Sequence, residues 1–158
     1  MQKPLLNQLA PGFSLESTDD QTISPWDYKG KKGLVMLFFD PRDSRDLAVL
    51  SEIRRRYREI TDASAEVLAI ASGPKVELME CAEGMDLPFP LLSDADNDAR
   101  SRYGVSATSV FVTDRFGELK MDLEVPEDLD AALDAVISTL ELADLECPEC
   151  SVAVWPEE

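Results

Sequence analysis

The chain has 158 residues, of which 44% are hydrophobic, enough for one domain with a proper core. Its net charge of −17 excludes the basic surface that nucleic-acid phosphates or an acidic membrane would attract. The N-terminus lacks the apolar core of a signal peptide, and no run approaches the roughly 20 apolar residues of a membrane-spanning helix. We therefore expect a cytoplasmic protein without nucleic-acid or membrane partners.

Histidine is absent, and the three cysteines are Cys81, Cys147 and Cys150. The lack of histidine excludes histidine-ligated zinc and any Ser–His or Cys–His nucleophile pair. An odd number of cysteines without a signal peptide argues against a structural disulfide framework. Any thiol or metal chemistry must therefore come from these three sulfur atoms and from carboxylates.

The first half of the chain predicts three strands and one helix. Two short strands, Phe13–Ser17 and Thr22–Ile23, flank a turn-forming stretch, and the apolar run Leu34–Phe39 predicts a strand buried on both faces. Asp43 and Asp46 fit a variant of an N-terminal capping box, with a carboxylate serving each end. One helix is expected after them, because apolar residues recur at three- and four-residue spacing: Leu47, Leu50, Ile53, Tyr57 and Ile60.

The second half predicts a strand, two short helices, a hairpin and a long helix. Glycine just past the end is expected to close each short helix, and Pro126 is expected to open the last helix. The predicted elements are the strand Val67–Ala71, the helix Pro74–Glu83 before Gly84, the helix Asp96–Tyr103 before Gly104, the hairpin of Val110–Val112 and Glu118–Leu123, and a helix with the buried stripe Leu129, Leu133, Val136, Ile137 and Leu140.

Parallel crossovers followed by an antiparallel hairpin predict an α/β fold whose mixed central sheet has helices on both faces. We find no internal repeat or low-complexity linker. The sequence therefore predicts a single domain over residues 1–145, followed by an acidic tail over residues 146–158 that contains Cys147 and Cys150.

Five motifs occur in order between residues 9 and 143: LAPGFSL at Leu9–Leu15, the stretch from Ile23 through DYKGKK to LFFDP at Pro41, FPLLSD at Phe89–Asp94, YGV at Tyr103–Val105 and FVTDRFG at Phe111–Gly117. Together they resemble the peroxiredoxins of the alkyl hydroperoxide reductase and thiol-specific antioxidant type. The resemblance implies a thioredoxin-like fold and a role in thiol-dependent peroxide metabolism.

In that family a P-x-x-x-T-x-x-C motif follows the buried strand, and its thiolate attacks the peroxide while Thr and a distant Arg stabilise the charge. Counting from Pro41 places Arg45 at the Thr position and Ala48 at the Cys position. Thr108 or Ser109 occupies the usual place of the Arg. Because a methyl group cannot attack a peroxide, the resemblance implies a degenerate family pocket at Pro41, Arg45, Ala48 and Thr108.

A different register does not supply the missing thiol. The C-x-x-C frame of thioredoxin-like reductases places Asp43 and Asp46 at the two cysteine positions, and no cysteine precedes Cys81. Cys81 itself is expected to be a small, partly buried core residue of a short helix.

The pair Cys147 and Cys150 leaves three interpretations open. The pair can act as a redox dithiol, it can remain as two reduced thiols, or it can provide two ligands for zinc. Zinc would need the same pair from a second subunit of a homodimer, or Cys81 plus a carboxylate, to complete the site. The neighbouring Asp144, Glu146 and Glu149 should raise the pKa of both thiols and slow their attack near neutral pH.

Two functions follow from these residues. The first is a peroxiredoxin-like protein without a cofactor, whose thiol chemistry lies at Cys147 and Cys150 and whose partner is a thiol reductant. The second is a non-catalytic binding module that holds a partner in the pocket near Arg45, Ala48 and Thr108 or through the acidic tail. Arg42 and Arg45 could bind a small anion there, unless they pair locally with Asp40, Asp43 or Asp46.

Overall fold

The computed structural model describes residues 4–125 and 128–144 and contains one seven-stranded mixed sheet in the order β2-β1-β5-β4-β3-β6-β7. The strands are β1 (Leu15–Ser17), β2 (Thr22–Ile23), β3 (Gly33–Phe39), β4 (Ala65–Ala71), β5 (Leu91–Ser93), β6 (Ser109–Thr113) and β7 (Leu119–Glu124). The helices are η1 (Pro25–Tyr28), α1 (Ser44–Arg55), α2 (Tyr57–Asp62), α3 (Lys75–Met85), α4 (Asp98–Arg102) and α5 (Leu129–Asp144).

Strand β3 forms the centre of the sheet, and every one of its residues is buried, as its continuous apolar run predicts. It pairs in parallel with β4 and antiparallel with β6, so that Val35 lies opposite both Val67 and Val112. Strand β5 extends the parallel part, while β7 and β1 add antiparallel pairs. The predicted mixed sheet is therefore confirmed.

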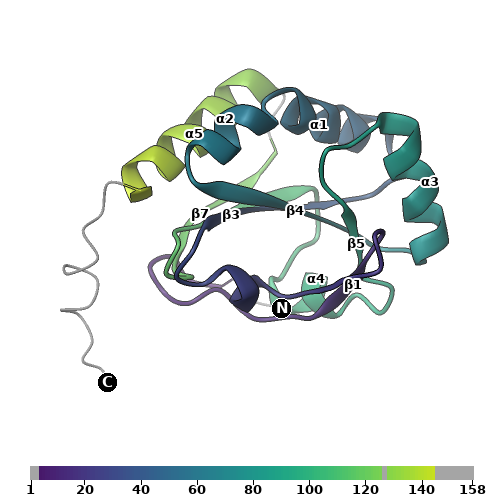
Figure 1. Ribbon diagram of the computed structural model, residues 1–158, viewed down its shortest axis with the longest axis horizontal. Helices are drawn as coiled ribbons and strands as arrows, with labels where there is room; N and C mark the ends of the chain where they lie inside the picture. The colour runs from purple at the N-terminus through teal and green to yellow at the C-terminus, as the bar shows by residue number, and fades with distance from the viewer. Residues whose placement is uncertain (1–3, 126–127, 145–158) are drawn as a thin grey trace.

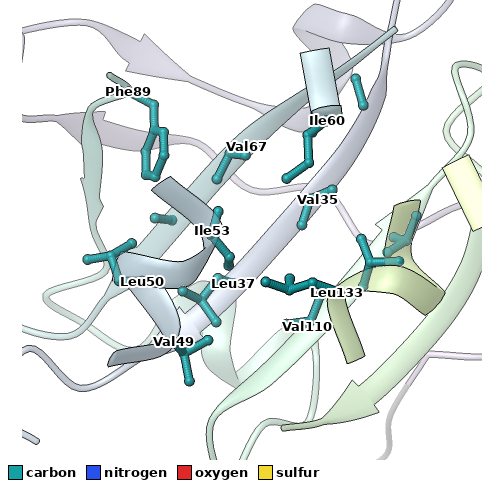
Figure 2. Packing of buried hydrophobic residues seen from close by; sticks show 14 of the residues in the cluster. Val35, Leu37, Val49, Leu50, Ile53, Ile60, Val67, Phe89, Val110 and Leu133 are labelled. Atoms are coloured by element: carbon teal, nitrogen blue, oxygen red, sulfur yellow. The ribbon is translucent and has the colours of Figure 1, made fainter. Parts of the chain in front are cut away.

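Helices cover both faces of the sheet, but unequally (Figure 1). Helices α1, α2, α3 and α5 pack on one face, where Leu50 and Ile53 of α1 and Leu133 of α5 meet β3 and its neighbours (Figure 2). Helix α4 and the N-terminal segment cover the other face. There Tyr103 contacts three aromatic rings at centroid distances of 5.0 to 6.0 Å, those of Phe13, Phe38 and Phe111.

The single helix predicted after Asp43 is wrong, because the chain forms α1 and α2 with a break at Arg56. The Arg56 backbone leaves the helical region, with φ −103° and ψ 13°. Its mostly buried guanidinium pairs with Glu59 at 3.0 Å and with Asp134 of α5 at 2.7 Å. These pairs link Arg56 to both α2 and α5 at the point where the helix direction changes.

One helix boundary and one strand also differ from the prediction. Gly84 lies inside α3, and the left-handed residue that follows the helix is Asp86, with φ 52°. Strand β5 was not predicted, since its three residues are too few to show a pattern beside Pro88 and Pro90. Gly104, with φ 62°, follows α4 as expected.

Among the helices of the described residues, none has the length and apolar character that a membrane crossing requires.

Candidate functional site

A cavity of about 650 Å³ lies beyond the carboxyl end of β3. The first turns of α1, the segment before β6, the end of β7 and the start of α5 surround it. We call it the Ala48 cavity and define it by its polar and central lining residues: Asp40, Arg45, Ala48, Arg100, Thr108 and Glu124. Its size is within the range of small-molecule sites in proteins.

The structure brings together three of the four residues that the resemblance assigned to the family pocket. Arg45, Ala48 and Thr108 line the cavity, whereas Pro41 lies in the turn between β3 and α1 and is not part of the lining. The Ala48 side chain is exposed on the second turn of α1. The group presented at this position is therefore a methyl group in an accessible cavity.

Aspartates fix the backbone that carries this part of the cavity. Asp43 is the N-cap of α1, and its Oδ1 accepts a hydrogen bond from the Arg45 amide at 2.8 Å. Asp46 does not complete the predicted capping box. Its buried carboxylate accepts instead from the Asp40 amide at 2.8 Å, which ties the end of β3 to α1.

The Asp40 carboxylate is held in its ionised form. Its Oδ1 accepts from the Arg42 backbone amide at 2.9 Å, and this bond is the main reason why the pKa of Asp40 lies below its usual value. The Arg42 guanidinium, 3.3 Å away, and the positive charge of Arg100 lower this pKa further. The cavity therefore has a fixed negative charge at the end of β3.

The two arginines that were predicted to bind an anion differ in their surroundings. Arg42 pairs with Asp40, as the alternative of local pairing predicted, and it does not line the cavity. Arg45 lines the cavity and forms no ion pair with another described residue. Only Arg45 of this pair is placed to contact a ligand there.

Arg100 is a cavity residue that the sequence analysis missed. The buried Asp94 accepts from the Ala99 amide at 3.1 Å and from the Arg100 amide at 2.9 Å, which fixes the start of α4. The Arg100 Nη2 then donates to the Phe39 carbonyl at 3.3 Å, while its buried Nε makes no hydrogen bond with a described residue. The FPLLSD motif contains Asp94, but no spacing in the sequence links Arg100 to β3.

Residues 6–121 match the model of the AhpC/TSA family. The chain belongs to this family. It is 33% identical over 111 residues to the chloroplastic peroxiredoxin Q of Triticum aestivum, covering 69% of this chain and 48% of the wheat protein. It is 28% identical over 106 residues to peroxiredoxin Bcp of Escherichia coli K12, covering 66% and 67% of the two chains. The chain thus spans about half the length of the wheat relative.

Solved structures confirm the thioredoxin-like fold. The peroxidoxin BcpB of Mycobacterium tuberculosis superimposes with a TM-score of 0.80 at 18% identity, over 90% of this chain and 98% of that one. The bacterioferritin comigratory protein of Xanthomonas campestris gives a TM-score of 0.73 at 18% identity, over 84% and 92%. At these identities the likeness shows the fold alone.

The thiol chemistry of an AhpC/TSA chain depends on where its cysteines lie, and Cys81 is the one cysteine among the described residues. Cys81 lies on α3, packs against the core under α1 and does not line the Ala48 cavity. Burial raises the pKa of the Cys81 thiol, so little thiolate is present at neutral pH. Cys147 and Cys150 lie outside the described residues.

The zinc interpretation was also open to Cys81. Within the described ranges, no group of three or more Cys, Asp or Glu side chains is placed to hold a metal ion. A zinc site that uses Cys147 and Cys150 involves residues outside these ranges and stays a prediction.

Proposed function

We propose that this AhpC/TSA protein acts in thiol redox metabolism through Cys147 and Cys150, and that no residue of its Ala48 cavity attacks peroxide. The observation that carries the proposal is the composition of the cavity, whose lining among the described residues includes the Ala48 methyl group and no sulfur atom. Peroxide reduction by a thiol needs a thiolate within reach of the peroxide oxygen. A cavity without a thiol can bind a ligand but cannot perform that step.

The chemistry assigned to Cys147 and Cys150 is the oxidation of two thiols to one disulfide. With hydrogen peroxide, one thiolate attacks an oxygen, the O–O bond breaks, and the second thiol displaces the resulting sulfenic oxygen. The products are a disulfide and two water molecules, which take up the two thiol protons. A thiol reductant, the partner class that we propose, then returns the pair to its reduced form by thiol–disulfide exchange.

The course of α5 supports a site separate from the Ala48 cavity. Leu129 at its start lines that cavity, whereas Ala143 near its end lies beside Gly33 at the opposite end of β3. A helix of 16 residues is about 24 Å long. Two residues separate Asp144 from Cys147, so three Cα-to-Cα steps join them, and three steps span at most about 11 Å.

Peroxide consumption in the presence of a thiol reductant tests the proposal. We expect the native chain to consume peroxide and the Cys147→Ser/Cys150→Ser variant to do no better than buffer. Cys81→Ser is the matched control, since it removes a thiol of raised pKa outside the cavity, and it should match the native rate. A native chain that consumes no peroxide and exchanges no disulfide rules out the redox function.

The second candidate is a binding module that uses the Ala48 cavity for a small anion. The observation in its favour is Arg45, which lines the cavity without an ion pair to a described residue. Titration with acetate, followed through the amide shifts of Arg45 and Ala48, tests it. Arg45→Gln should abolish the shifts, and Arg58→Gln, on the exposed surface of α2 and outside the cavity, should leave them unchanged. Equal effects of the two variants contradict a site in the cavity.

A further inference from the structure

A second cavity, of about 350 Å³, lies at the opposite end of the sheet. It is formed by η1, the start of α2, the start of β4 and the segment before β5. We call it the Tyr57 cavity and define it by three aromatic and three acidic lining residues: Tyr28, Tyr57, Phe89, Asp19, Asp27 and Glu66. None of these residues has a place in the family motif around Ala48.

The aromatic part of the cavity is held in place by contacts between different elements. The rings of Tyr57 and Phe89 lie 5.3 Å apart at an interplanar angle of 46°. The Tyr57 hydroxyl donates a hydrogen bond of 2.7 Å to Glu66 Oε1, which joins α2 to β4. Tyr28 packs from η1 against the core of the other face. Aromatic faces held in this way attract cations through their quadrupoles.

The carboxylates are held beside these rings. Glu66 Oε1 also accepts from the Val67 amide at 2.9 Å, and its Oε2 makes no hydrogen bond with a described residue. Asp27 Oδ2 accepts from the Ser24 amide at 3.0 Å. Burial, and then the negative charges of Glu66, Asp27 and Asp19, raise the pKa of Tyr28, so all three charges act at that one hydroxyl.

The balance of charge leaves this site without a cation of its own. Among the described residues, no lysine or arginine lines the Tyr57 cavity. Three acidic side chains therefore meet three aromatic rings in a space of small-molecule size. A hydrated inorganic ion would gain little from the rings, whereas an alkylated nitrogen can contact the rings and the carboxylates together.

We propose that the Tyr57 cavity binds an organic ammonium cation. The cation lies against the Tyr57 and Phe89 rings, and Glu66 Oε2 provides the nearest counter-charge. The shared chemistry is a positively charged nitrogen on an aliphatic chain, which a free alkylammonium compound or a lysine side chain of a protein can supply. The site is independent of the thiol chemistry proposed above.

Titration of the full-length, isotope-labelled chain tests the site, with the backbone amide shifts of Tyr28, Glu66 and Val67 as the signal. The probes are choline and its neutral isostere, in which carbon replaces the quaternary nitrogen. Nα-acetyl-lysine amide is the second cationic probe, and magnesium chloride at equal ionic strength controls for general attraction to the acidic chain. We expect localised shifts with choline or the lysine amide, and binding of the neutral isostere weaker by about 3- to 30-fold.

Two variants and one control connect the signal to named groups. Glu66→Gln removes the counter-charge and Tyr57→Leu removes a ring, and each should weaken choline binding by about 3- to 30-fold. Glu80→Gln makes the same change of charge on the exposed surface of α3, outside the cavity, and should bind as the native chain does. Melting temperatures show which variants remain folded, and the neutral isostere tests the site on the native chain alone.

The results distinguish the two sources of the cation from each other, and they also show whether the cavity binds a cation at all. Tighter binding of choline indicates a free alkylammonium ligand, and tighter binding of the lysine amide indicates a lysine side chain. Both support the cation site. Equal binding of choline and its isostere, equal loss in Glu66→Gln and Glu80→Gln, the same shifts with magnesium, or no localised shift with either cationic probe would overturn it.

Discussion

The Ala48 cavity and the Tyr57 cavity lie at opposite ends of β3 and β4 and differ in what their walls provide. The first combines two guanidinium groups with carboxylates around a methyl group, and the second combines aromatic rings with carboxylates. The family resemblance locates the first cavity but does not determine its chemistry. In the family the reactive atom belongs to a single cysteine, and this chain has Ala48 at that position. The second is built from separate segments; Tyr28 and Phe89 fall within motifs of the resemblance, but none of its residues belongs to the P-x-x-x-T-x-x-C motif.

The largest effect should come from rebuilding the family pattern in the Ala48 cavity. The variant Ala48→Cys/Arg45→Thr/Thr108→Arg places a thiol, a hydroxyl and a guanidinium at the positions that the resemblance assigns. Since one stabilising donor is worth about 100-fold or more in rate, we expect it to consume peroxide at least about 100-fold faster than Ala48→Cys alone. Stopped-flow measurement of peroxide loss checks this.

Both variants should be made in the Cys147→Ser/Cys150→Ser background, so that only the new thiol is measured. Ala48 is exposed, so its substitution should leave the melting temperature nearly unchanged. If the folded triple variant reacts no faster than Ala48→Cys, then the correspondence between Arg45, Ala48 and Thr108 and the family positions is wrong.

The next largest effect concerns the turn that shapes the Ala48 cavity. Asp46→Ala removes the buried acceptor of the Asp40 amide and should destabilise the chain by about 1 to 3 kcal/mol. For a chain of this size that corresponds to a fall in melting temperature of about 2 to 10 °C. Asp62→Ala, at the exposed end of α2, is the control and should change it by less than about 2 °C. Similar shifts in both variants would show that the Asp46 bond contributes little.

Much of the fold could be predicted because its signals are local. The apolar run of β3, the helical spacing in α1 and α5 and the turn before Gly117 each indicate their own element. The break at Arg56 could not be predicted, because the apolar spacing continues from Ile53 to Ile60 across it. That break depends on ion pairs with Glu59 and with Asp134 of a distant helix.

The sites could be predicted less completely than the fold, because their residues come from distant segments of the chain. Arg45, Ala48 and Thr108 could be placed in one pocket because the resemblance relates all three to known positions. Arg100 enters the cavity only because Asp94 fixes the start of α4 near the end of β3. The Tyr57 cavity joins residues as distant as Asp19 and Phe89, and no periodicity connects them.

A smaller effect should appear in the melting temperature at alkaline pH, and it tests the environment of Tyr57 in its cavity. Burial, the hydrogen bond with Glu66 and its charge raise the pKa of Tyr57 above its ordinary value. The folded state thus favours the protonated hydroxyl, and this stabilisation is complete below the unfolded pKa of about 10 and is lost as the pH rises through the folded pKa. We expect the melting temperature of the native chain to fall more steeply above about pH 10 than that of Tyr57→Phe.

Burial raises the pKa of Tyr28 and Tyr103 as well, so the variant should reduce the alkaline slope and not abolish it. Thermal unfolding at intervals between about pH 8 and 11 measures the slope. Identical slopes for the native chain and Tyr57→Phe would contradict the raised pKa of Tyr57 and weaken the case for a negatively charged cavity.

The smallest effect concerns the reactivity of Cys81. Because burial raises the pKa of its thiol, modification by an alkylating reagent should be slower than for a free thiol and should increase as the pH rises above about 8.5. In the Cys147→Ser/Cys150→Ser variant, Cys81 is the only thiol left to react. Fast labelling of that variant at neutral pH would show that Cys81 is accessible as a thiolate.

The most direct test locates the sulfur atoms that peroxide oxidises. The reduced native chain is treated with one equivalent of hydrogen peroxide, remaining thiols are alkylated, and peptides are mapped by mass spectrometry. We expect a disulfide between Cys147 and Cys150 while Cys81 is recovered as the alkylated thiol. Oxidation of Cys81, alone or in a disulfide with either of the other two, would contradict the assignment of the thiol chemistry to Cys147 and Cys150.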